Sequence, residues 1–61
     1  MTKQDYVKFA RLFKNQWSFV EEYDSSHRFM FNVLLDGVVH IFAQDNEKFD
    51  EKKFRHEVFG G

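Results

Sequence analysis

The chain contains no cysteine and no proline, and only three of its 61 residues are glycine. The lack of cysteine excludes a disulfide framework, a thiolate nucleophile and a cysteine-ligated zinc site within this sequence. Because proline and glycine-rich stretches are missing, no linker is indicated, and we expect a single domain over residues 1–61. A domain of this size must then be stabilised by its apolar core alone.

An excess of charge of either sign is missing as well. Nine lysines and arginines are balanced by ten aspartates and glutamates, which gives a formal net charge of -1. The basic excess that is common in nucleic-acid-binding domains is therefore absent. The residues after Met1 form no apolar signal segment, and no run approaches the roughly 18 apolar residues of a membrane span. The sequence predicts a cytoplasmic protein without a membrane segment, for which nucleic acid is not the expected partner.

The first segment has the pattern of an amphipathic helix over residues 3–22. Thr2 and Asp5 are spaced as in a capping box, where each side chain accepts a hydrogen bond from the other residue's backbone N–H. The apolar residues that follow recur every three or four positions, so they share one narrow face. That face is strongly aromatic and consists of Tyr6, Phe9, Ala10, Phe13, Trp17 and Val20.

The middle segment, residues 26–45, allows two interpretations. Asp36 and Gly37 lie between two apolar runs, which is a strong signal for a β-hairpin. In a hairpin, however, Asn32 and His40 would lie on otherwise apolar faces, whereas in a helix they join a polar side. We therefore favour a helix, preceded by a cap at Asp24 or one of the serines, in which Gly37 costs about 1 kcal/mol relative to alanine.

The third segment carries clear helix signals over residues 51–59. Asp50 is placed to cap the helix, and Phe49 and Phe54 have the spacing of a hydrophobic staple. Gly60 is expected to close the helix in a left-handed conformation, and Asn46 to do the same for the middle helix. Together the three segments predict an all-α fold of two longer helices and a short C-terminal one. The predicted core consists of Tyr6, Phe9, Phe13, Trp17, Val20, Met30, Leu34, Val38, Ile41, Phe42, Phe49 and Phe54.

Both ends of the chain resemble short open reading frames of bacteriophages and prophages. The opening Met1-Thr2-Lys3-Gln4-Asp5-Tyr6 is similar to their M-T-K-x-x-Y start. The run from Phe42 to Phe54 has the form F-A-x-D-N-x-x-F-D-x-x-x-F, followed by a glycine at Gly60. The resemblance implies a mobile-element origin and a helical fold, and it implies no particular reaction.

No constellation of residues indicates catalysis. His27, His40 and His56 are 13 and 16 residues apart, so no two of them form the H-x-x-x-H pair of a helical metal site. Adjacent carboxylates such as Glu21 and Glu22 have the pattern of a solvated surface, and no glycine-rich phosphate loop is present. We therefore expect a non-enzymatic protein without a catalytic site, metal or cofactor.

The aromatic content indicates a binding surface. Nine phenylalanines, two tyrosines and one tryptophan are more than a three-helix core of this length covers. An exposed apolar patch is typical of contact with another protein or with a second copy of the chain, as a homodimer. The residues outside the predicted stripes, and so the interface candidates, are Phe19, Phe29, Val33 and Val39. The alternative is a small nucleic-acid-associated regulator that uses the basic side of the first helix, Lys3, Lys8, Arg11 and Lys14.

Overall fold

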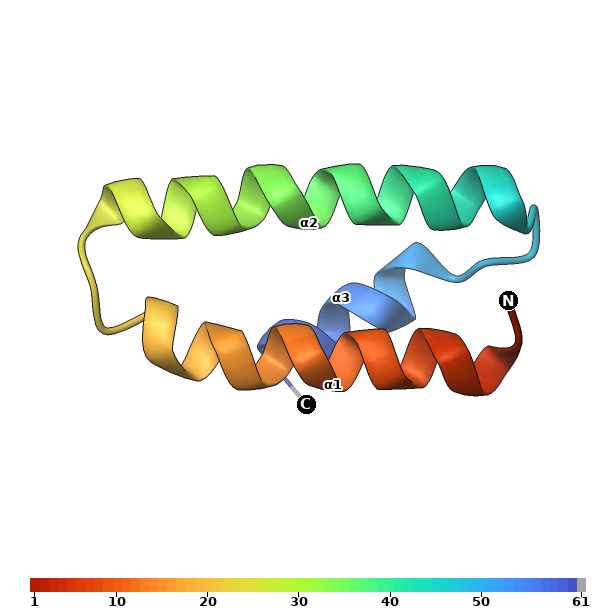
Figure 1. Ribbon diagram of the computed structural model, residues 1–61, viewed down its shortest axis with the longest axis horizontal. Coiled ribbons are helices and arrows are strands. Elements are labelled where there is room, and N and C mark those ends of the chain that lie inside the picture. The colour runs from red at the N-terminus through yellow and green to blue at the C-terminus, as the bar shows by residue number, and fades with distance from the viewer. Residues whose placement is uncertain (61) are drawn as a thin grey trace.

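The computed structural model describes residues 1–60 and folds them into three helices (Figure 1). They are α1 (Lys3–Val20), α2 (Ser25–Asp45) and α3 (Glu51–Phe59), and no strand occurs in this part of the chain. The predicted all-α fold is confirmed, and the segment around Asp36 and Gly37 is helical rather than a hairpin. The first helix ends at Val20, two residues earlier than expected, and the middle one begins at Ser25, one residue earlier.

Each helix begins at a side chain that accepts a hydrogen bond from the free backbone N–H groups of the first turn. The capping box of α1 is formed: the Thr2 hydroxyl accepts from the Asp5 N–H at 3.3 Å, and the Asp5 carboxylate accepts from the Thr2 N–H at 2.8 Å. The Asp24 side chain caps α2 by accepting from the Ser26 and His27 N–H groups, and the Asp50 side chain caps α3 by accepting from the Lys53 N–H. These are the groups that a helix N-terminus otherwise leaves unsatisfied, so the local sequence fixes where each helix starts.

The C-terminal ends of two helices differ from expectation. Gly60 has a φ of -119° and continues the right-handed conformation, with its N–H donating to the His56 carbonyl at 2.7 Å. Asn46 is extended, with a φ of -147°, and its N–H donates to the Phe42 carbonyl. Both predicted left-handed caps are therefore wrong. In each case a backbone hydrogen bond to the last turn closes the helix without a positive φ.

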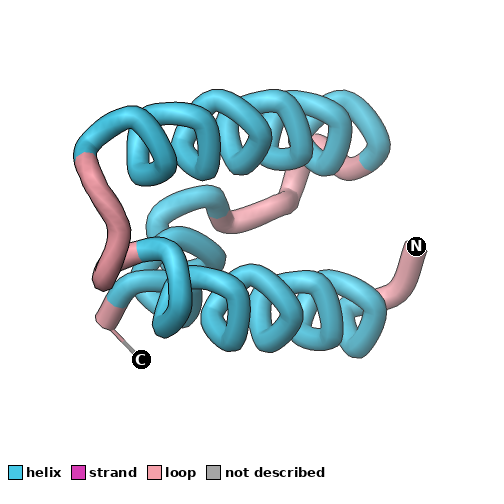
Figure 2. Tube along the Cα trace, turned by 60° about the vertical axis from the view of Figure 1, so that its left-hand side comes forward, coloured by secondary structure: helices cyan, strands magenta, loops and turns pink. Residues whose placement is uncertain are grey.

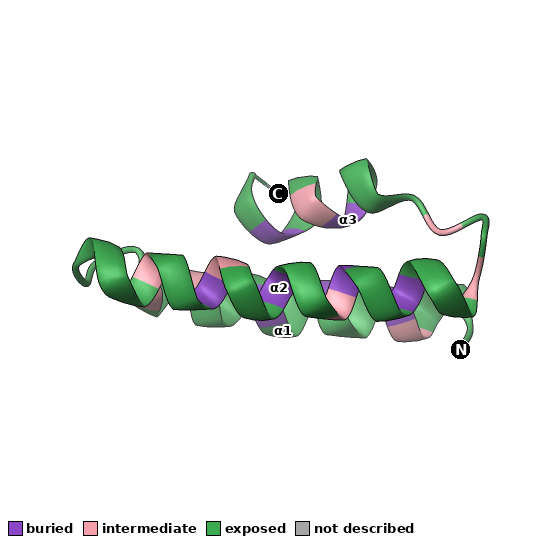
Figure 3. Cartoon of the chain, turned by 90° about the horizontal axis from the view of Figure 1, so that it is seen from above, coloured by how far each residue is buried: buried purple, intermediate pink, exposed green. Residues whose placement is uncertain are grey.

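The helices form two unequal layers. α1 and α2 run antiparallel along the long dimension of the molecule, joined by a short connection at one end (Figure 2). α3 folds back on one side of this pair and leaves the other side uncovered (Figure 3). The molecule measures 34 × 18 × 15 Å. Because α3 has nine residues and α2 has 21, the third helix is about 14 Å long against about 31 Å for α2, and it covers less than half of its length.

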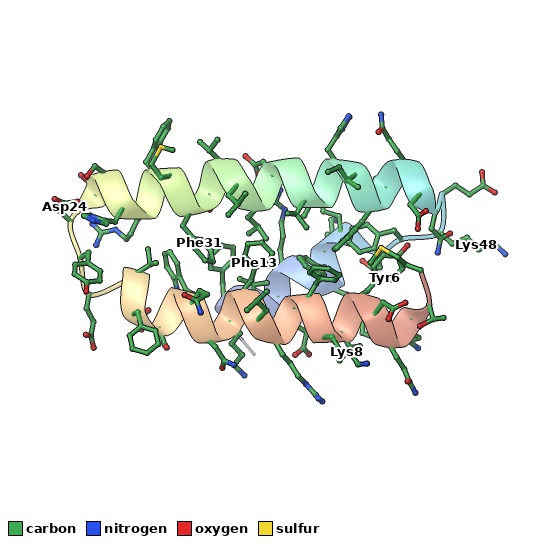
Figure 4. All side chains as sticks on the ribbon, viewed as in Figure 1. Tyr6, Lys8, Phe13, Asp24, Phe31 and Lys48 are labelled. Atoms are coloured by element: carbon green, nitrogen blue, oxygen red, sulfur yellow. The ribbon has the colours of Figure 1, made fainter. Side chains whose placement is uncertain are left out.

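The core is a cluster of aromatic rings where the three helices meet. The ring of Phe42 lies 5.0 Å from Tyr6, 5.3 Å from Phe9 and 5.5 Å from both Phe49 and Phe54. At the other end of the core Phe13 packs edge-on against Phe31 (Figure 4). Such edge-to-face pairs stabilise a core beyond the area that they bury. The buried residues are Tyr6, Ala10, Phe13, Phe31, Leu35, Val39, Phe42, Phe54 and Val58.

The predicted core is correct for most positions in α1 and α3, and in α2 it is correct for Val38 and Phe42 and wrong for Met30, Leu34 and Ile41. Tyr6, Phe13, Phe42 and Phe54 are buried as expected. The partly buried residues Trp17, Val20, Val38 and Phe49 pack against them. Phe9, Met30, Leu34 and Ile41, by contrast, are exposed, and α2 turns Phe31, Leu35 and Val39 inward instead.

The rotation of α2 has a physical reason in its polar residues, which were expected to face solvent. Asp36 accepts a hydrogen bond from Arg55 of α3 at 2.6 Å, which ties α2 to α3. Arg28 donates to the Tyr23 carbonyl at 2.8 Å, and Asn32 donates to the Arg28 carbonyl at 2.8 Å. Arg28 and Asn32 are thus half-buried with hydrogen-bond partners, Asp36 stays exposed as expected, and Met30, Leu34 and Ile41 face outward.

The aromatic cluster predicts how strongly the domain depends on α3. Phe54 is almost fully buried and contacts the rings of Phe13, Phe42 and Phe49. Phe54→Ala should therefore lower the free energy of unfolding by about 3–5 kcal/mol, enough to unfold a domain of this size. Denaturant titration followed by far-UV circular dichroism measures this change. Phe29→Ala is the matched control and should change stability by less than about 0.5 kcal/mol, because Phe29 is exposed. Equal effects of the two substitutions would show that α3 is not docked.

Candidate interaction surfaces

The side of the molecule that α3 leaves uncovered carries a row of large apolar side chains. Met30, Leu34 and Ile41 are exposed to 62%, 61% and 61%, and they follow one another along α2 at intervals of four and seven residues. At 100° per residue these positions lie within roughly 40° of arc, so they form a single line on the helix. Apolar groups in a continuous line, unlike scattered ones, are typical of a contact surface.

α1 contributes the other half of this surface. Leu12 borders a groove between α1 and α2 whose far wall is formed by Met30 and Leu34. Phe13 and Phe31 also line this groove, so its base continues into the core. Phe9 and Phe19 extend the apolar surface along α1, because they lie three residues before and seven after Leu12. We call this surface the open face and define it by Phe9, Leu12, Phe19, Met30, Leu34 and Ile41.

The four predicted interface residues are only partly where they were expected. Phe19, Phe29 and Val33 are exposed, and Phe19 belongs to the open face. Phe29 lies 100° around the helix from Met30 and therefore points to its side. Val33 borders the open face. Val39 is 4% exposed and packs in the core, so its placement on the surface was wrong.

Sequence analysis missed the three residues that dominate the open face because it assigned them to the core. The sequence did indicate that some apolar side chains of α2 are exposed, since α2 is apolar around most of its circumference. That signal does not tell which apolar side is turned inward. Contacts between helices decide it: Phe31 and Phe42 pack against rings of α1 and α3, and Asp36 accepts a hydrogen bond from Arg55 of α3.

The open face is uncharged at its centre and bordered by acidic residues at the α1–α2 connection. No residue that defines the open face carries a charge. At the α1–α2 connection, Asp24 accepts hydrogen bonds from the Ser26 hydroxyl at 2.7 Å and from the His27 ring at 2.8 Å (Figure 4). The hydrogen bonds from His27 and Ser26 hold the pKa of Asp24 far below its usual value, so this end stays acidic. Glu21 and Glu22 add to the acidic character there.

A second groove lies between α1 and α3 and has a different chemistry. Its base is apolar and includes Tyr6 and Phe54, while four cations stand around it. These cations are Lys3, Arg11, Lys48 and Lys53. Within residues 1–60 none of the four is in an ion pair, and Asp50 and Glu57 are the acids that line the same groove.

The predicted basic side of α1 is divided by this groove. Lys3 and Arg11 line it, whereas Lys8 points away from α2 on the lower side of α1 in Figure 4. Lys14 also lies outside the lining residues. The four cations are thus spread over roughly 140° of the helix and form no single patch.

The tyrosine in this groove is held by a carboxylate. The Tyr6 hydroxyl donates to Asp45 at the end of α2 at 3.1 Å. Desolvation raises the pKa of Tyr6 above its usual value, and the hydrogen bond to Asp45 adds to the increase. Tyr6 therefore stays protonated and serves as a donor that joins α1 to α2.

The remaining titratable residues are dispersed. Within residues 1–60 no three histidine, aspartate or glutamate side chains lie close enough together to hold a metal ion. No helix in the described part of the chain combines the length and the apolar character that crossing a membrane requires.

Two consecutive leucines give a direct test of how α2 is rotated. Leu35 is 0% exposed and Leu34 is 61% exposed. Leu35→Ala should lower the free energy of unfolding by about 2–5 kcal/mol because it opens a cavity, whereas Leu34→Ala should change it by less than about 0.5 kcal/mol. Unfolding is measured at protein concentrations where the midpoint no longer depends on concentration. The reverse order of the two effects would contradict the orientation of α2.

Comparisons with family models, with curated proteins and with solved structures find no match to this chain.

Proposed function

We propose that this chain is a non-enzymatic protein-interaction module that binds a protein surface through its open face. The observation that carries the proposal is the line of Met30, Leu34 and Ile41, each more than three-fifths exposed on a folded helix. Keeping three such side chains in water is unfavourable by about 25 cal/mol for each Å² of apolar area, and a partner removes this cost. The mechanism is steric: the bound surface is covered by the module.

The whole-molecule surface area supports the same conclusion. The accessible surface is 4745 Å², whereas a compact monomer of 7.4 kDa exposes about 4200 Å². The excess arises because α3 covers one side of the α1–α2 pair and nothing covers the other. In protein interfaces a few apolar or aromatic anchors carry most of the affinity, and the open face offers such anchors on both helices.

The resemblance to bacteriophage and prophage reading frames supports a role as an accessory protein of a mobile element. We propose that the partner is a protein of the host cell or of the element itself. Small proteins of this kind need no reaction centre to change a partner's activity, because occupation of a functional surface is sufficient.

Site-specific photo-crosslinking tests this function. Leu34 is replaced by p-benzoylphenylalanine, and Phe29, which is equally exposed but points to the side, is replaced in a matched control. Because the photoreactive group captures only C–H groups in direct contact, position 34 should give discrete protein adducts in the producing cells and position 29 should not. Adducts are identified by mass spectrometry. A lack of adducts at position 34, or equal adducts at position 29, would contradict the proposal.

A second candidate function is nucleic-acid binding, and the groove between α1 and α3 favours it. The groove brings Lys48 and Lys53 beside Lys3 and Arg11, so cations from two helices and a loop converge. If phosphates bind there, gel shifts with mixed DNA and RNA should weaken as salt rises, and Arg11→Ala should weaken binding and reduce the salt dependence. Lys8→Ala, outside the groove, is the control. The lack of a shift at low salt would exclude this candidate.

A further inference from the structure

We draw no further inference here: the strongest candidate, the outward apolar side of α2 with Met30, Leu34 and Ile41, belongs to the open face already described, and nothing in the structure shows what covers it.

Discussion

The aromatic contacts of Phe42 are the interaction on which the rest of the structure depends. This ring contacts Tyr6 and Phe9 of α1, Phe49 of the loop and Phe54 of α3, so all three helices meet at it. They meet a second time at Phe31, whose ring contacts Trp17 of α1 and Phe59 of α3. Edge-to-face packing needs defined ring orientations, and it therefore fixes where α3 crosses the α1–α2 pair. Without the docking of α3, to which the packing of Phe59 on Trp17 also contributes, α1 and α2 would form a two-helix hairpin with much of its apolar surface in water.

Because α3 is short, its docking covers one side of the α1–α2 pair and leaves the molecule asymmetric. With nine residues the helix covers one side of the α1–α2 pair, and Arg55 fastens it to Asp36 of α2 at 2.6 Å and to Glu51 within α3 at 2.9 Å. Both hydrogen bonds raise the pKa of Arg55, with the bond to Asp36 as the larger cause. The buried side chains Phe31, Leu35 and Phe42 turn the same side of α2 toward α1 and α3. As a result the apolar residues on the opposite side of α2 are left facing outward.

Local rules were sufficient to predict the helices, and they were insufficient to predict the rotation of α2. The capping box at Thr2 and Asp5, the cap at Asp24 and the staple of Phe49 and Phe54, whose rings lie 5.6 Å apart, all involve neighbours in the sequence. Such contacts are visible in the spacing of residues. The rotation depends instead on residues far away in the sequence, such as Phe59 against Phe31 and Arg55 against Asp36, and no periodicity in α2 encodes those contacts.

It was predictable that apolar side chains remain exposed, but not which residues form the open face. The number of rings indicated that some apolar surface stays exposed, yet the residues chosen for the core, Met30, Leu34 and Ile41, turned out to be that surface. Val39, chosen for the surface, is buried. On a helix that is apolar nearly all round, an error of about 100° in rotation exchanges the two sets while leaving the hydrophobic pattern equally well satisfied.

A helix that is apolar nearly all round is usually packed on all sides by other elements. Within one chain, α2 is packed on one side only. One side of α2 packs on α1 and α3 through Phe31, Leu35 and Phe42. The other side presents Met30, Leu34 and Ile41, with Gly37 between them where a second helix can come closest. A protein bound along this side would enclose α2 on both sides, which is the surrounding that an apolar helix requires. Folding and association would then use opposite sides of the same helix, so substitutions on one side leave the other process unchanged.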